Sequence, residues 1–287
     1  MRKLIIIPVL IFLLGSCKKD NIEYISGNTP PPDFTVETVV KENYVNKLYI
    51  SILGRQATDI EYSEGLELVN KSDLSEAGRL ELISSIMDKE DYFHNEYETI
   101  REDLLNGVDT SEVTKYRNIL VNLKERTNDQ DLINSYDSLI KNLDLIHGII
   151  PGLENAAFNF VEVQRRCVDN YLYDKLNMGS ENFVVSIYQN FLFRYPTSEE
   201  TISAVDMVDG NQNIVNFEIG RSKRDFLKIF FSSDEYFEGQ VRTAFIRFLF
   251  REPNVEELFH MKGLYRADLE FKSMQKRILI LDEYVGI

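Results

Sequence analysis

Histidines, an oxygen-rich loop and acidic pairs are the residue types in this 287-residue chain that could support metal or acid–base chemistry. His94, His147 and His260 each lack a second His or Cys at a metal-binding spacing. His94 and Glu96 are two positions apart, which places them on different faces of a helix. We therefore expect the histidines to lie at the surface or at helix corners and to bind no metal.

The loop Asp209-Gly-Asn-Gln-Asn213 has alternating oxygen-bearing side chains, a pattern that suggests Ca²⁺. An EF-hand loop needs its glycine at the sixth position and a glutamate at the twelfth. Here the glycine is second, and the twelfth residue is Gly220. We interpret the segment as a polar turn.

The acidic pairs Glu199-Glu200 and Glu256-Glu257 fall at predicted helix starts, where the helix dipole accounts for them. Nucleophile-elbow, phosphate-loop and dinucleotide motifs are missing from the sequence, as is the Cys-x-x-Cys-His motif for haem. We therefore predict a protein that is not an enzyme and has no cofactor. The alternative is a hydrolase in which two carboxylates converge in a concave pocket and one has a raised pKa.

A motif that occurs three times is the strongest pattern in the chain. In each copy an Arg is followed three residues later by Thr or Asn, and then by Glu after three more. The copies are Arg55, Thr58 and Glu61; Arg194, Thr197 and Glu200; and Arg251, Asn254 and Glu257. The last two members have the spacing of a capping box, in which each side chain bonds the other residue's backbone N–H. We predict three corners between helices, with each Arg part-buried and bonded to helix-end carbonyls or to the capping Glu. The alternative is a binding role for the three Arg.

Each corner belongs to a longer repeated unit. An apolar, aromatic run precedes every corner, and a short segment ending in Tyr follows roughly 40 residues later, at Tyr92, Tyr236 and Tyr284. Between copies one and two, Val113–Leu123 and Leu132–Ile146 predict an antiparallel helical hairpin. We predict an all-α fold in which copies two and three pack consecutively, copy one docks beside them and the hairpin projects.

Two local predictions complete the fold. A long helix is expected from about Leu153 to Leu176, and Ile214–Phe217 is the short strand candidate. Cys167 lies at helical spacing with Phe160 and Val163, which favours a buried thiol over a reactive one.

The corner pattern resembles a known group of domains. An apolar helix, Leu-x-Arg-x-Pro and a later Ser-x-Glu-Phe-like segment are similar to bacterial extracellular helical domains of unknown function, which are phycobilisome-linker-like. The Arg-x-Pro-Thr-x-x-Glu element also resembles a domain found beside cytochrome c modules. The resemblance covers residues 36–93 and 181–287, without the Gly and Trp typical of the first group's middle helix. Neither group has an assigned catalytic residue, so the resemblance implies none here.

The first residues have the features of an export signal. Arg2 and Lys3 precede the apolar stretch Leu4–Leu14, which is followed by small residues and Cys17. This arrangement resembles a lipoprotein signal peptide, which implies cleavage before Cys17 and acylation of Cys17 by palmitate-type chains. We expect a lipoprotein in the cell envelope of a Gram-negative bacterium. The outer membrane is favoured because Lys18 is not the Asp that favours inner-membrane retention, and the face of the membrane is left open.

The chain divides into five predicted segments. They are a signal peptide (1–16), a lipidated Cys and flexible tether (17–34), helical repeat 1 (35–106), a hairpin with a connecting helix (107–180), and helical repeats 2 and 3 (181–287). Removing Arg2 and Lys3 takes the formal net charge from −15 to −17. Such an acidic chain is a poor partner for nucleic acid.

Aromatic residues gather around corners two and three. Tyr188, Phe191, Tyr195 and Phe248 are either core residues or the lining of a binding groove, and we single them out as the candidate binding surface. We predict a non-enzymatic module that is anchored to the membrane through acylated Cys17 and binds or scaffolds an envelope protein or glycan.

Overall fold

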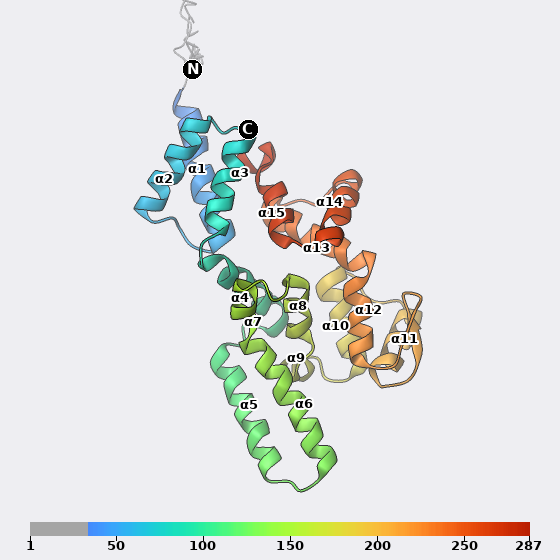
Figure 1. The fold of residues 1–287 in the computed structure, drawn as a ribbon. Helices are drawn as coiled ribbons and strands as arrows, with labels where there is room; N and C mark the ends of the chain where they lie inside the picture. The colour runs from blue at the N-terminus through green and yellow to red at the C-terminus, as the bar shows by residue number, and fades with distance from the viewer. Residues whose placement is uncertain (1–33) are drawn as a thin grey trace, which may run out of the picture.

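The computed structural model describes residues 34–287, which form sixteen helices and one two-stranded antiparallel sheet (Figure 1). The predicted all-α class is confirmed. The predicted signal peptide, Cys17 and the tether as far as Asp33 lie outside the described residues. No described helix combines the length and the apolar content needed to cross a bilayer.

Copy one is a group of four helices. They are α1 (Phe34–Leu53), α2 (Asp59–Ser72), α3 (Glu76–Met87) and α4 (Asp91–Leu105). Tyr44, Leu48 and Ile52 of α1 are buried and recur every four residues, so they share one face of the helix. That face is covered because α1 packs against α2, α3 and α4.

The predicted hairpin is present. Helices α5 (Thr110–Glu125) and α6 (Gln130–His147) lie side by side and project from the rest of the molecule (Figure 1). Asp129 starts α6 by accepting hydrogen bonds from the backbone N–H groups of Asp131 and Leu132.

The predicted long helix from Leu153 to Leu176 is wrong. This stretch holds the end of α7 (Ile149–Glu154), then α8 (Phe160–Val168) and α9 (Tyr171–Leu176). The breaks have a local cause, because Asn159 and Asn170 each adopt extended backbone and cap the following helix with their side-chain oxygen. Asn170 also donates from its side-chain amide to the carbonyls of Arg166 and Cys167, which closes the end of α8.

Copies two and three follow along the chain. Their helices are α10 (Ser180–Leu192), α11 (Ser198–Val208), α12 (Lys223–Ser232), α13 (Asp234–Leu249), α14 (Val255–Asp268), α15 (Phe271–Leu279) and α16 (Asp282–Val285). A small hairpin of β1 (Asn213–Val215) and β2 (Glu218–Gly220) joins α11 to α12. The strand candidate 214–217 is confirmed in part, because Asn216 and Phe217 form the turn with φ of 48° and 65°.

Copy one packs against the end of the chain, as predicted. Helix α13 contacts α10, α14, α15 and α16, while α15 contacts α3 of copy one. The Tyr44 hydroxyl donates to the Leu279 carbonyl at 3.3 Å. We call the region where α4 meets α8, α13 and α15 the seam, because it joins distant parts of the chain, such as Glu96 and Arg247 at a sequence separation of 151.

Candidate functional site

All three predicted capping boxes form. The backbone N–H of the cap residue donates to the capping glutamate at 2.9 Å in corner one, 2.7 Å in corner two and 2.7 Å in corner three. The N–H of each glutamate donates back to the cap side chain. The corner residues are therefore in place as helix starts.

The corner arginines are bonded to the capping glutamates, as predicted. In corner two, Nη1 and Nη2 of Arg194 donate to the two oxygens of Glu200 at 2.9 and 2.7 Å, and Nε donates to Glu235 at 2.5 Å. Arg55 and Arg251 have the same bidentate bond.

The second carboxylate at each corner was missed in the sequence. It is Asp91, Glu235 or Glu283, and each of these bonds the Nε of its corner Arg. The signal was present, since an acidic residue directly precedes the repeated Tyr in every copy. The arginine thus ties the corner to the helix that begins at the end of its own unit.

These contacts favour a structural role for the corners. The guanidinium of Arg194 is the main cause that lowers the pKa of Glu200 to about 2. It also lies 5.0 Å from the ring centre of Tyr188, and the equivalent ring is under Arg55 and Arg251. Because Nε, Nη1 and Nη2 of every corner Arg already have acceptors, these groups have little left to offer a ligand.

Three of the four residues in the predicted aromatic surface are in the core. Tyr188, Phe191 and Phe248 are 2%, 3% and 1% exposed, whereas Tyr195 is 70% exposed. The prediction is wrong for the first three because they lie on the inward faces of α10 and α13, where Tyr188 and Phe191 pack on Phe230.

Two other aromatic residues near corners two and three are exposed, and they lie directly after α10 and α13. Phe193 and Phe250 are 54% and 83% exposed and have left-handed backbone, with φ of 57° and 56°. Gly54 is the equivalent residue of corner one, with φ of 68°. A bulky side chain in this conformation is unusual, which makes the two phenylalanines worth testing.

The three histidines are exposed, as predicted. The pairing of His94 with Glu96 does not occur, because Glu96 is 1% exposed and bonded inside the seam. His94 instead lies near Glu90 and Glu154, with one ligand atom of each within 4.8 Å of the others. All three are exposed, and exposed acidic groups often gather in this way without a cation.

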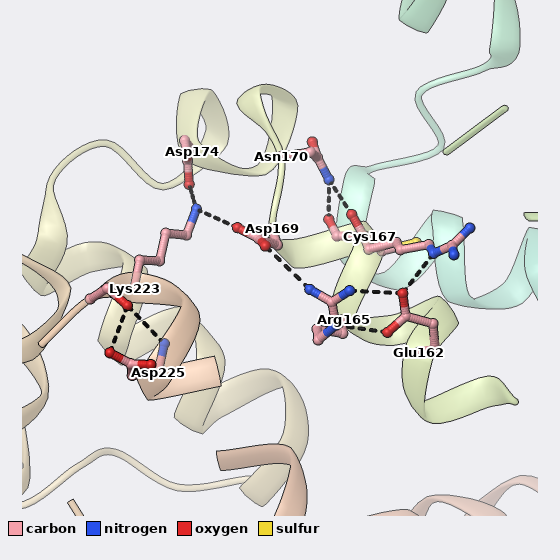
Figure 2. A network of polar contacts seen from close by, with 10 residues as sticks. Glu162, Arg165, Cys167, Asp169, Asn170, Asp174, Lys223 and Asp225 are labelled. Atoms are coloured by element: carbon pink, nitrogen blue, oxygen red, sulfur yellow. Dashed lines mark hydrogen bonds and ion pairs between the residues drawn. The ribbon is translucent and has the colours of Figure 1, made fainter. Parts of the chain in front are cut away.

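A polar network joins α8 and α9 to α12 (Figure 2). Arg165 bonds Glu162 at 2.7 Å and Asp169 at 3.3 Å, while Lys223 reaches from α12 to Asp174 at 2.5 Å. These carboxylates are all partnered, so the network serves the packing of the three helices.

Cys167 sits beside this network and is fully buried, as predicted (Figure 2). Burial raises the pKa of its thiol to about 12. The thiol therefore stays protonated at neutral pH and is a poor nucleophile.

The seam contains a cavity of about 280 Å³. Helix α4 contributes Glu96, Thr99, Ile100 and Asp103 to its lining. The remaining residues are Phe160 and Gln164 of α8, Phe193 of corner two, Phe271 of α15, and Gln240, Thr243, Ala244, Ile246, Arg247 and Phe248 of α13. The cavity is therefore lined by segments that only the tertiary fold brings together.

The polar groups at the base of the cavity form a chain of hydrogen bonds. Glu96 accepts from Arg247 Nη1 at 2.9 Å and from Gln275 Nε2 at 3.0 Å. Gln275 in turn accepts from the Tyr92 hydroxyl at 2.7 Å, and Arg247 Nη2 donates to the Ser51 carbonyl at 3.1 Å. The side chain of Glu96 is only 2% exposed, so its charge depends on Arg247 for compensation.

A second polar group lies on the wall formed by α8 and α13. Gln164 Nε2 donates to Gln240 Oε1 at 2.7 Å, and the Tyr236 hydroxyl donates to Gln164 Oε1 at 2.5 Å. The hydroxyls of Thr99 and Thr243 donate to the carbonyls of Asn95 and Gly239 within their own helices.

Asp103 is different from the other polar residues of the cavity. Within residues 38–287 its carboxylate has no hydrogen bond and no ion pair. It is exposed and lines the cavity, as do the exposed side chains of Phe193 and Ile246, so we place it at the mouth. Burial by neighbouring atoms raises the pKa of Asp103, while Arg247 lowers it and Glu102 raises it by smaller amounts.

The cavity has the character of a ligand site, with apolar and aromatic walls and a few convergent polar groups. No pattern in the sequence indicated this cavity, because Asp103 and Arg247 do not belong to a local motif. Comparisons with protein-family models, curated proteins and solved structures gave no match.

Proposed function

We propose that this chain is a non-enzymatic binding or scaffolding module of the bacterial cell envelope, and that it holds a protein or glycan partner at the seam cavity. The observation that carries the proposal is the cavity itself. It joins a hydrogen-bonded polar base to an apolar wall and an exposed mouth, where the carboxylate of Asp103 has no bonded partner within residues 38–287. Binding sites combine apolar area with a few placed polar groups in this way.

The proposed location follows from the N-terminal sequence. Acylation of Cys17 would anchor the module to the outer membrane, because two or three acyl chains hold a protein firmly. Incorporation of labelled palmitate into the full chain tests this, with Cys17→Ala as the comparison. Equal labelling of the two chains, or recovery of the wild type in soluble fractions, would refute the anchor.

The binding role is tested by blocking the cavity mouth in the full chain. Thr243 is exposed, lines the cavity and bonds its own helix, so Thr243→Trp should fill the mouth without disturbing the core. Thr114→Trp is a matched control, because Thr114 is also exposed and bonds the carbonyl of Thr110 on the distant hairpin.

Tagged full chains are recovered from solubilised envelopes after cross-linking, and bound protein and sugar are identified. We expect a partner with the wild type and with Thr114→Trp, and its loss with Thr243→Trp. A partner that Thr243→Trp retains would place binding elsewhere, and no reproducible partner would contradict the proposed function.

A hydrolase is the second candidate, because the cavity holds two carboxylates, Glu96 and Asp103, and the pKa of Asp103 is raised. Against it, both oxygens of Glu96 are already bonded. Hydrolysis of aryl glycosides or esters that Asp103→Asn abolishes would establish this candidate, and unchanged rates in the two chains would remove it.

A further inference from the structure

The charges in the seam cavity do not cancel. Arg247 and Glu96 form one neutral pair at the base, with a distance of 2.9 Å between Nη1 and Oε2. Asp103 then leaves one unbalanced negative charge at the mouth of a cavity whose walls are mostly apolar and otherwise uncharged. An occupant that complements this site carries one positive charge.

The polar atoms left for an occupant are few. Gln164 donates to Gln240 and accepts from the Tyr236 hydroxyl, and the hydroxyl hydrogens of Thr99 and Thr243 are donated to backbone carbonyls. A sugar would need partners for several hydroxyl groups, and unmade hydrogen bonds inside a site are costly. An apolar stem with a single cationic head needs only the walls and Asp103.

We propose that the seam cavity receives a basic side chain, lysine or arginine, from a protein partner. Its stem lies against Phe193, Ile246 and Phe248, and its cationic head pairs with Asp103. This assignment rests on the binding role proposed above and selects a protein partner over a glycan. The exposed aromatic ring of Phe193 also lines the cavity, and aromatic rings attract cations through their charge distribution.

The acidity of the whole chain supports the same choice. The formal net charge of −15 attracts basic partners and steers them toward the surface. A partner with an acidic side chain at this position would be repelled by the carboxylate of Asp103 and would also lose the hydration of its own charge.

The test uses the full chain in detergent micelles and three capped tripeptides, Gly-X-Gly, in which X is lysine, arginine or norleucine. Binding is measured by saturation-transfer NMR, with empty micelles as the blank. We expect the lysine and arginine peptides to bind about fivefold more tightly than the norleucine peptide, as for one partly exposed ion pair. Thr243→Trp should abolish binding of all three.

Asp103→Asn should remove the difference between the charged and uncharged peptides. Glu102→Gln is the matched control, because Glu102 is the next residue of α4, is exposed and does not line the cavity. It should keep the preference. Equal binding of all three peptides to the wild type would overturn the inference and leave the cavity as a binding site.

Two further outcomes also decide between the proposals. Preferential binding of glucosamine oligomers, lost with Asp103→Asn, would replace the protein partner by a glycan. Envelope partners that are still captured by Thr243→Trp would instead refute the proposed site.

Discussion

The corners and the seam are both built from arginine and carboxylate side chains, but these side chains are bonded differently in the two regions. At each corner an Arg meets two carboxylates, and Nε, Nη1 and Nη2 all donate. In the seam Arg247 meets Glu96 and a backbone carbonyl, and the oxygens of Asp103 have no direct bond to any residue from 38 to 287. The polar groups of the corner arginines are therefore bonded within the fold, whereas Asp103 is the seam group that we propose a partner contacts.

The two regions also differ in exposure. The corner arginine side chains are 34–36% exposed, whereas the side chain of Glu96 is 2% exposed. Water screens the corner ion pairs, while Glu96 of the seam pair has lost nearly all of its hydration. Breaking the seam pair should therefore cost far more stability than breaking a corner, and five substitutions compare the two regions in order of expected effect.

The largest effect is expected for Glu96→Ala. It leaves Arg247 and Gln275 without their shared acceptor in a buried site, which costs roughly 3–5 kcal/mol. Urea unfolding of the full chain measures the loss, with Glu200→Ala as the corner counterpart. A loss no greater than that of Glu200→Ala would show that the seam pair is not the stronger of the two.

Gly54→Ala should have the second largest effect on stability, and it tests how the backbone of corner one differs from that of the other corners. Gly54 has φ of 68°, and an added Cβ would lie 2.2 Å from Oδ1 of Asn95. The clash and the left-handed backbone together should cost about 2 kcal/mol. Phe250→Ala keeps the same backbone in corner three, with φ of 56°, and should change stability by less than about 0.5 kcal/mol. Equal effects would mean that Asn95 does not restrict corner one.

Arg194→Met should cost about 1 kcal/mol at neutral pH, because a part-exposed ion network and a capping box are weakened. It should also change the pH dependence. The pKa of Glu200 falls to about 2 in the folded state, below the ordinary value of about 4.3. The contribution is present above pH of about 4 and is lost as the pH falls toward 2.

Unfolding free energies measured from pH 7 to pH 2 should therefore fall less in Arg194→Met than in the wild type. Glu162 is the control site, because it belongs to a separate ion network. Its bonds to Arg165 and Arg166 should be the same in the wild type and in Arg194→Met. Parallel pH profiles for wild type and Arg194→Met would show that Glu200 does not need Arg194 for its low pKa.

The smallest effect is expected for Phe193→Gly and Phe250→Gly. Glycine adopts the left-handed conformation without strain but has more freedom when unfolded, so each should stabilise the chain by about 0.5 kcal/mol. Binding should separate the pair, because Phe193 lines the seam cavity and Phe250 does not. Loss of peptide binding in both variants, or in neither, would contradict the role given to Phe193.

Local patterns in the sequence determined the corners, the α5–α6 hairpin and the all-α class. Capping residues act within three positions, and the apolar period follows the helix, so neighbours in sequence suffice to predict them. The same reasoning failed between Leu153 and Leu176. There Asn159 and Asn170 cap new helices, although the sequence around them also fits a single continuous helix.

The aromatic positions show the limit of such patterns. Tyr188 and Phe248 are of residue types that are common at interfaces, yet both are buried. Which face of a helix is covered depends on what packs against it, and the residue types do not show this. The exposed phenylalanines 193 and 250 end their helices where corner one has glycine, and nothing in the local pattern ranks them above their buried neighbours.

The sequence by itself determined where helices begin, where they turn and which residues cap them, because those choices depend on contacts within a few residues. Only the tertiary structure decided that α4 faces α13 and α15, that Glu96 meets Arg247 at a sequence separation of 151, and that Asp103 has no bonded partner in the described part of the chain. Burial and charge compensation at the seam are properties of surfaces that meet, so they exist only after the chain has folded.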